Sequence, residues 1–228
     1  HKQFAKQFAQ QMTKLTGNKY KYSPAKNFYH ELSAQDCSVQ LSGELKNLAV
    51  MLTKISNDLR WMNSGPLAGI SDIELKALQP GSSIMPGKVN PVIPEAVAMA
   101  SADVIGNDVS ITIAAQSGSF QLNVMLPVIA YNLLKSINLL SGSMNALSKN
   151  AIKSFKVNHK NLEVSLSKNP ILVTALNSII GYEKAASIAK KAYKENRPII
   201  EVAAEETDLT KSKLEKLLDP TKLAKGGI

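Results

Sequence analysis

Residues 41–62 read LSGELKNLAVMLTKISNDLRWM, and this stretch decides the fold class of a chain of 228 residues. Its apolar side chains recur at alternating spacings of four and three, at Leu41, Leu45, Leu48, Leu52, Ile55, Leu59 and Met62. This period predicts one long helix, from about Ala34 to Asn63, with a packing seam of the coiled-coil type. Ser33 is expected to cap its N-terminus, with Asp36 close to the positive end of the helix. Such a seam cannot be buried by one helix, so partner helices of similar length are required.

Two later segments have the composition of such partners. The first begins around Pro91 and Pro94, carries Val97, Val104, Ile105 and Val109, and is expected to end near Ala115. The second runs from about Leu122 to Lys149 with apolar residues at Ile129, Leu133, Ile137, Leu140, Met144 and Leu147. Pro127 either kinks this helix or lies in its first turn. Because strand-like alternation is scarce, the chain is predicted to be all-α, built on a long-helix bundle.

The character of the chain changes after about Val157. Helical pieces become short and rich in Lys and Glu, with breaks at Pro170, Gly181, Pro198, Asp208 and Pro220. We therefore expect a small helical C-terminal domain over residues 157–228 and assign residues 1–156 to the bundle. Apolar residues already repeat at helical spacing from Phe4 to Leu15, so the chain is expected to start within a helix and to be part of a longer protein.

Composition narrows the classes of partner. The net charge is +9, but nearly all the cations are lysines, and arginine occurs only at Arg60 and Arg197. Reading of bases and phosphates favours arginine, and the lysines are scattered through Glu-bearing helices, so nucleic-acid binding is not favoured. The single cysteine, Cys37, excludes an internal disulfide. No apolar run reaches the roughly 18 residues that indicate a membrane span.

Residues 81–91, GSSIMPGKVNP, form a loop between the long helical segments. Its glycines allow backbone conformations closed to other residues, and its prolines stop helix formation. Two hydroxyls, one ammonium and one amide lie within it, which are groups that hold an anion and move a proton beside it. The residues alone leave a structural alternative open, with Ser82 and Ser83 as turn residues, Lys88 as a surface cation and Asn90 as a helix cap.

Gly81, Ser82, Met85, Lys88 and Asn90 fit the pattern Gly-Ser-x-x-Met-x-x-Lys-x-Asn, so the stretch resembles the signature of the fumarase/aspartase superfamily. The resemblance implies a helical-bundle fold and an elimination reaction. In that reaction a proton leaves the carbon next to a carboxylate, water or an amine leaves the neighbouring carbon, and the intermediate is an aci-carboxylate. The resemblance implies no metal and no organic cofactor. It also implies a homotetramer whose active sites are shared between subunits.

The same resemblance gives roles to individual residues. Ser82 is implied to be the catalytic base, and Lys88 and Asn90 to bind the carboxylate on which negative charge grows, with Ser83 also binding substrate. Glu95 is implied to pair with a histidine from another segment and to help a water act as the acid, although a carboxylate at a helix N-terminus is favourable without any such role. The superfamily's Thr-His and Ser-Ser-Asn stretches do not occur here. This chain is therefore expected to supply one of three contributions to each site and to be inactive alone.

Within the superfamily the chain is most similar to the later central part and C-terminal domain of class II fumarases. This similarity is carried by Pro86-Gly87-Lys88 and by residues 173–177, 181–186 and 217–220, whereas Gln121 before Leu122 is more similar to aspartases. The expected activity is the reversible hydration of fumarate to L-malate. The alternatives are an aspartate ammonia-lyase and a non-catalytic helical oligomerisation module. We expect a cytoplasmic protein, or a mitochondrial-matrix one if it is eukaryotic, with neither nucleic acid nor membrane as a partner.

Overall fold

The computed structural model describes residues 1–65, 68–79, 84–85 and 87–226. Helices dominate this part of the chain, and the strands in it are two short ones of two residues each, so the all-α prediction is confirmed. The chain divides into two compact units. Residues 1–60 and 76–154 form the first, called here the bundle unit, and residues 61–75 and 155–228 form the second, called here the C-terminal unit. The predicted domain boundary between residues 156 and 157 stays a prediction.

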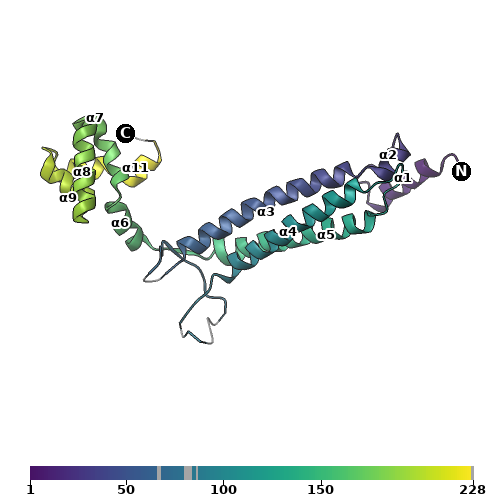
Figure 1. The fold of residues 1–228 in the computed structure, drawn as a ribbon, viewed down its shortest axis with the longest axis horizontal. Coiled ribbons are helices and arrows are strands. Elements are labelled where there is room, and N and C mark those ends of the chain that lie inside the picture. The colour runs from purple at the N-terminus through teal and green to yellow at the C-terminus, as the bar shows by residue number, and fades with distance from the viewer. Residues whose placement is uncertain (66–67, 80–83, 86, 227–228) are drawn as a thin grey trace. The chain divides into compact units, whose positions relative to one another are not determined.

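Three long helices make up most of the bundle unit (Figure 1). Its elements are α1 (Phe4–Leu15), α2 (Phe28–Ser33), α3 (Asp36–Met62, of which the last two residues belong to the C-terminal unit), α4 (Val92–Gln116), α5 (Leu126–Leu147) and the π-helical turn η1 (Ser148–Ile152). Pro127 lies in the first turn of α5, where its missing N–H costs no helical hydrogen bond. The three lengths, 27, 25 and 22 residues, match the expectation of partner helices of similar length.

Two predicted helix ends were wrong. Ser33 does not cap α3, because it is the last residue of α2, a short helix that was not predicted. Asn27 caps α2 instead, since its side chain accepts hydrogen bonds from the backbone N–H of Tyr29 and of His30. The predicted start of α5 near Leu122 is four residues early, because Ser119 and Leu122 pair across a tight turn.

Asn123 joins the end of α4 to the start of α5. Its amide nitrogen donates to the carbonyl oxygens of Ala114 and Ala115, at 3.0 and 3.2 Å, and its carbonyl oxygen accepts from the N–H of Met125 at 2.8 Å. The side chain is almost fully buried. One asparagine thus satisfies free carbonyls at one helix end and an N–H just before the next helix, which fixes the turn between α4 and α5.

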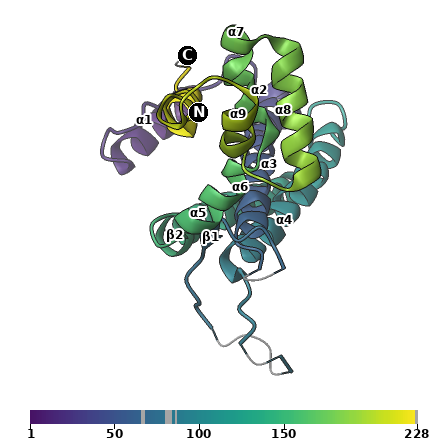
Figure 2. The ribbon, with the colours of Figure 1, turned by 90° about the vertical axis from the view of Figure 1, so that its left-hand side faces the viewer.

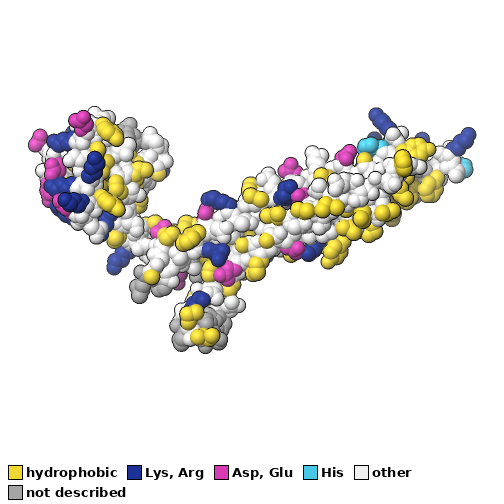
Figure 3. Space-filling view, in the orientation of Figure 1, with side chains coloured by type: hydrophobic (Ala, Val, Ile, Leu, Met, Phe, Trp, Pro, Cys, Tyr) yellow, Lys and Arg dark blue, Asp and Glu magenta, His cyan; other side chains and the backbone are white. Residues whose placement is uncertain are grey.

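The predicted packing seams were only partly right. On α3 the buried residues are Ser42, Ala49, Leu52, Ser56 and Leu59, and on α5 they are Ile129, Ser136, Leu140, Ser143 and Leu147. Small residues therefore occupy buried positions where only large apolar side chains were expected. Predicted seam residues left exposed are Leu41 and Ile55 on α3, Val109 on α4, and Ile137 and Met144 on α5. Hydrophobic side chains accordingly run along the surface of the bundle unit (Figure 3).

Helix α4 carries apolar residues on its exposed side as well as on its buried side. Val97, Val104 and Ile111 are buried within the bundle, whereas Met99 and Ile113 on the same helix are exposed. Among the described helices it is also the one long and apolar enough to cross a membrane by length and composition, a test that core helices of bundles pass as well. Its Asn107 and Asp108 are nevertheless buried and hydrogen-bonded to the neighbouring helices, so the structure uses α4 as a bundle helix.

The C-terminal unit is built from short elements around its own core. They are β1 (Ile73–Glu74), β2 (Lys156–Val157), α6 (His159–Ser167), the 3-10 helix η2 (Pro170–Leu176), α7 (Asn177–Ile180), α8 (Tyr182–Glu195), α9 (Ile199–Glu206), α10 (Lys211–Leu217) and α11 (Pro220–Ala224). The core contains Leu172, Val173, Leu176, Ile188, Ile199, Val202, Leu214 and Leu218. The strands pair antiparallel, with Ile73 opposite Val157 and Glu74 opposite Lys156. Figure 2 labels the two strands next to each other. This short pairing was not predicted, because two residues are too few to alternate.

Candidate functional site

The signature stretch leads directly into α4. The structure describes Ile84, Met85 and residues 87–91 of it, whereas the predicted base Ser82 and the predicted substrate-binding Ser83 lie outside the described residues. Gly87 has a φ of +81°, in the left-handed region that favours glycine, and an added Cβ would meet no atom within 4 Å. The positive φ, rather than lack of space, thus favours glycine at position 87. Lys88 follows it directly in the sequence.

Lys88 and Asn90 present unoccupied polar groups just before α4. Lys88 is exposed and Asn90 is half-buried, and the backbone carbonyl of Asn90 accepts from the N–H of Val92 at 2.9 Å. Neither side chain hydrogen-bonds or ion-pairs with any residue that the structure describes. An ammonium and an amide left free in this way are available to an anionic ligand.

Glu95 lies in the first turn of α4 and is half-buried. The helix N-cap, Pro91, offers no side-chain hydrogen bond, so the N–H groups of the first turn keep their partial positive charge. A carboxylate is favourable there. The histidine partner implied for Glu95 does not come from the described chain, in which His30 instead lies within 3.6 Å of Glu31 and 3.7 Å of Asp36.

The arrangement can bind a carboxylate and polarise it. A cation, a directional amide donor and a helix N-terminus lie within eight residues, from Lys88 to Glu95. Together they can stabilise negative charge that grows on a bound carboxylate, and Glu95 can hold or relay a proton through water. The described residues contain no group of three His, Cys, Asp or Glu side chains that could hold a metal ion. The roles of Ser82, Ser83, Lys88, Asn90 and Glu95 stay predictions.

The chain that enters the signature stretch is tightly folded. The backbone of Gly69 lies so close to that of Ser64 and Gly65 that an added Cβ would be 2.3 Å from the Ser64 carbonyl carbon. Ser64 accepts from Ile70 N–H through its hydroxyl at 3.0 Å and from Ser71 N–H through its carbonyl at 2.7 Å. Glycine is therefore needed at position 69, and these contacts hold Gly69, Ile70 and Ser71 against Ser64 after α3.

A second polar cluster lies inside the bundle and was missed by the sequence analysis. The Asp108 carboxylate on α4 is buried, and it accepts from the Ser42 hydroxyl at 2.7 Å and from the Lys46 ammonium at 2.6 Å, both on α3. Burial raises the pKa of the Asp108 carboxyl, but the hydrogen bonds from Lys46 and Ser42 and the charge of Lys46 outweigh it and hold the pKa below its usual value. Because Lys46 balances the charge of Asp108, this cluster connects α3 to α4 and does not offer a free charge to a ligand.

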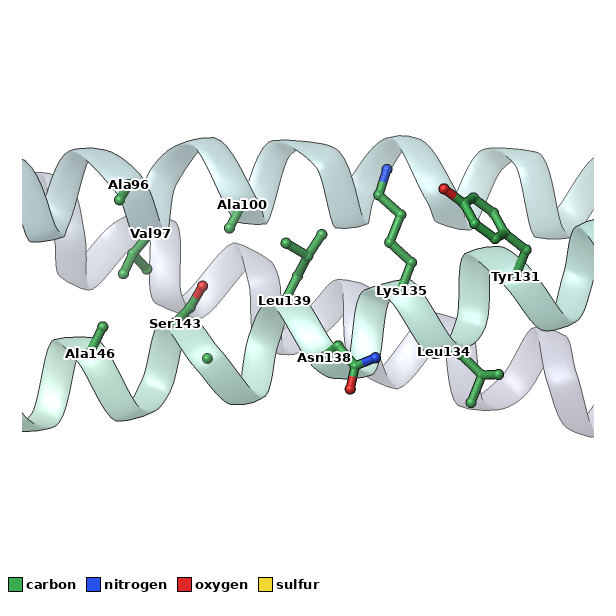
Figure 4. A pocket seen from close by; sticks show the side chains of 11 residues that line it. Ala96, Val97, Ala100, Tyr131, Leu134, Lys135, Asn138, Leu139, Ser143 and Ala146 are labelled. Carbon is green, nitrogen blue, oxygen red and sulfur yellow. The ribbon is translucent and has the colours of Figure 1, made fainter.

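An open groove of about 740 Å³ lies between α4 and α5 in the bundle unit. Figure 4 shows its lining, which is mostly apolar and includes Ala96, Val97 and Ala100 from α4 and Tyr131, Leu134 and Leu139 from α5. The cation in it, Lys135, donates to Asp103 at 2.9 Å, which raises the pKa of Lys135. With its cation paired and its walls apolar, the groove suits a helix better than a small dicarboxylate.

Two family models match the chain. One describes a lyase and matches residues 1–106, and the other describes the C-terminus of fumarase C and matches residues 172–225. Among curated proteins, fumarate hydratase class II 2 of Pseudomonas aeruginosa is 60% identical over 228 residues, covering 100% of this chain and 49% of its own length. Fumarate hydratase class II of Xylella fastidiosa strain 9a5c is 57% identical over 225 residues, covering 99% and 47%. The chain spans about half the length of the curated relatives it matches.

Solved structures agree with these sequence matches. A crystal structure described as fumarate lyase:delta crystallin from Brucella melitensis, bound to cobalt, superposes with a TM-score of 0.90 at 40% identity, over 96% of this chain and 47% of that one. Recombinant class II fumarase from Schistosoma mansoni superposes with a TM-score of 0.88 at 32% identity, over 98% and 50%.

Proposed function

This chain belongs to the family of lyases that contains the class II fumarate hydratases, and on that premise we propose that the complete protein interconverts fumarate and L-malate. The observation that carries the proposal is the signature stretch, in which the side chains of Lys88 and Asn90 have no recorded partner among the described residues, just before α4. A dicarboxylate supplies the anionic groups that such a site binds.

The proposed reaction removes water from malate by anti elimination. The Ser82 alkoxide takes the proton from the carbon next to one carboxylate and becomes a hydroxyl, and that carboxylate becomes an aci-carboxylate dianion held by Lys88 and Asn90, with Ser83 also in contact. The hydroxyl then leaves the neighbouring carbon with a proton delivered by a water that Glu95 holds. The products are fumarate and water, and hydration follows the same steps in reverse. No metal and no organic cofactor takes part in this scheme.

We propose further that the active sites are completed by other parts of the protein in a homotetramer. The support is the apolar surface that this chain leaves uncovered, namely the outer side of α4 and the groove between α4 and α5. Apolar residues exposed along a bundle helix, such as Met99, Val109 and Ile113 on α4, are normally covered by a partner, and copies of the same bundle provide helices of matching length.

An aspartate ammonia-lyase is the second candidate, favoured by Gln121 before Leu122. Gln121 follows the C-terminal end of α4, whereas Lys88 precedes its N-terminal end. A helix of 25 residues spans about 37 Å at 1.5 Å per residue, so Gln121 and Lys88 of one chain cannot contact the same small substrate. This separation weakens the main sequence argument for the aspartase alternative within one subunit.

Single substitutions in the complete protein test the site. Lys88→Met is expected to lower kcat/KM for L-malate by about 10²- to 10³-fold, because it removes the charge that stabilises the developing dianion. Ser82→Ala is expected to lower kcat by about 10²- to 10⁴-fold. Lys76→Met is the control, since Lys76 is an exposed lysine outside the signature stretch. If Lys88→Met were as active as Lys76→Met, Lys88 would return to the role of a surface cation.

A further inference from the structure

The segment that enters the signature stretch is anchored by residues far away in the sequence. Three successive backbone carbonyls, those of Ile70, Ser71 and Asp72, accept hydrogen bonds from residues 158 and 161. The Asn161 amide nitrogen donates to Ile70 O at 2.5 Å, across 91 positions. The Asn158 amide nitrogen donates to Ser71 O at 3.0 Å, across 87 positions, and the Asn158 N–H donates to Asp72 O at 2.9 Å. We call Asn158 and Asn161 the asparagine clamp.

The hydrogen bonds of the asparagine clamp hold a segment whose backbone has an unusual dihedral angle. Ser71 has a φ of +51°, which only a few per cent of non-glycine residues adopt. A residue in this region persists where surrounding interactions hold it, and such positions gather at functional sites. The clamp supplies these interactions from the side of β2 and α6, where Asn158 lies between the strand Lys156–Val157 and the helix His159–Ser167.

The residues that follow in the sequence, up to Leu75, are held by contacts at two further points. Leu75 N–H donates to the Asn63 side-chain oxygen at 2.7 Å, and Ile73 pairs with Val157 across the short strands. Ile73 and Leu75 are both buried. Within the C-terminal unit, the chain is therefore held at several points up to Leu75, the last residue of this segment of the unit.

We infer that Asn158 and Asn161 are positioning residues for the signature stretch. They restrain the backbone of residues 70–72, and we expect loss of this restraint to affect the reaction at the signature stretch, which follows in the sequence. Neither asparagine touches the signature residues themselves in the described chain, so they act through the backbone of residues 70–75. This inference rests on the function proposed above, because it assigns the clamp a role in that reaction.

The clamp can be removed without breaking the helix that carries it. The Asn158 side-chain oxygen also caps α6, by accepting from the N–H of Asn161 at 3.3 Å. Asn158→Asp keeps an oxygen for this cap but loses the donor to Ser71. Asn161→Asp loses the donor to Ile70 and places a carboxylate in the first turn of α6, where it is favourable. Asn169→Asp is a matched control, because Asn169 caps η2 through Ile171 N–H in the same unit, and the structure records no bond from it to residues 70–72.

The experiment compares the complete wild-type protein with the Asn158→Asp/Asn161→Asp double variant and with Asn169→Asp. For the double variant we expect kcat for L-malate to fall on the order of tenfold, with KM nearly unchanged, since misplaced catalytic groups slow the chemical step. Hydrogen exchange of backbone amides in residues 69–79 should become faster in the double variant only. The melting temperature should be similar in all three proteins.

Two results would overturn the inference. Unchanged exchange in residues 69–79 of the double variant would show that the clamp does not restrain the segment. Faster exchange with an unchanged kcat would show that the restraint does not matter for catalysis. If the wild-type protein converts no malate, the proposed function fails and the positioning role fails with it. The exchange measurement then still reports whether the clamp exists, so the two failures can be told apart.

Discussion

We expect the packing of α3 against α4 to depend most on Asp108. Lys46→Met would leave its buried carboxylate with the Ser42 hydroxyl as its one remaining recorded partner, and we expect the free energy of unfolding to fall by about 1–3 kcal/mol at neutral pH. Urea unfolding of the chain measures this loss. Lys54→Met is the control on the same helix, because Lys54 pairs with Asp58 at the exposed surface, where we expect less than about 0.5 kcal/mol.

The pair of Lys46 and Asp108 also predicts that the free energy of unfolding depends on pH. The pKa of Asp108 is lower in the folded chain than its ordinary value of 3.8, so its stabilising contribution is complete above pH 3.8 and is lost as the pH falls below it. Without Lys46, protonation would instead relieve an unpaired buried charge. The difference in unfolding free energy between wild type and Lys46→Met should therefore shrink as the pH falls from neutral to below 3.8. A difference that stays constant over this range would contradict the assignment.

Replacing buried serines by alanine is expected to change the free energy of unfolding in opposite directions at different sites. The hydroxyls of Ser56 and Ser101 are buried and have no hydrogen-bond partner among the described residues, whereas Ser42 donates to Asp108. Ser101→Ala is expected to be neutral or to stabilise the chain by up to about 1 kcal/mol, and Ser42→Ala to destabilise it by about 1–3 kcal/mol. Urea unfolding of both variants decides this. Equal losses would mean that Ser101 has a partner in solution.

A motif pointed to single residues, whereas contacts between distant residues left no trace in the sequence. Lys88, Asn90 and Glu95 were singled out by resemblance to a known signature, and their roles stay predictions; all three lie just before α4 or in its first turn. The bond from Ser42 to Asp108 spans 66 positions and that from Asn161 to Ile70 spans 91. Nothing in the spacing of a polar side chain reveals a partner at such a distance, so these contacts required the structure.

At the scale of elements, apolar periodicity and helix-breaking residues predicted where the long helices lie. They did not predict which side of each helix is buried, because that depends on how the helices pack. The long helices α3, α4 and α5 were all expected, because apolar periodicity over more than 20 residues is a strong signal. The buried face of α3 was misjudged, since Ser42, Ala49 and Ser56 are buried while Leu41 and Ile55 are exposed. Small side chains let helix backbones approach closely, and a count of large apolar residues does not register them.

The short elements of the C-terminal unit depend on their shared core. Ile188 on α8 is buried in that core, whereas Ile179 on α7 is 43% exposed. Ile188→Ala is therefore expected to lower the free energy of unfolding by about 2–5 kcal/mol, while the chemically identical Ile179→Ala should cost less than about 1 kcal/mol. Thermal unfolding followed by circular dichroism compares the two. Similar losses at both positions would show that the assignment of this core is wrong.

At the scale of the whole molecule, the apolar groove between α4 and α5 tests the proposed assembly. Leu134 in the groove is 61% exposed, and Ile171 in the C-terminal unit is 69% exposed. In the complete protein, Leu134→Arg should shift the particle mass from a tetramer to smaller species, because a buried, unpaired charge would be placed in the interface. Ile171→Arg should leave the mass unchanged. Mass measurement by light scattering distinguishes them, and a monomeric wild-type protein would refute the assembly.

The most direct test of the central claim is an ultraviolet assay of fumarate formation. The complete protein, containing this chain and the missing half of its relatives' length, is offered L-malate and, separately, L-aspartate. We expect conversion of malate and not of aspartate, with no activity from the 228-residue chain alone. Conversion of aspartate would favour the Gln121 signal over the fumarase-like stretches. Conversion of neither substrate would contradict the account and leave the chain as a helical scaffold.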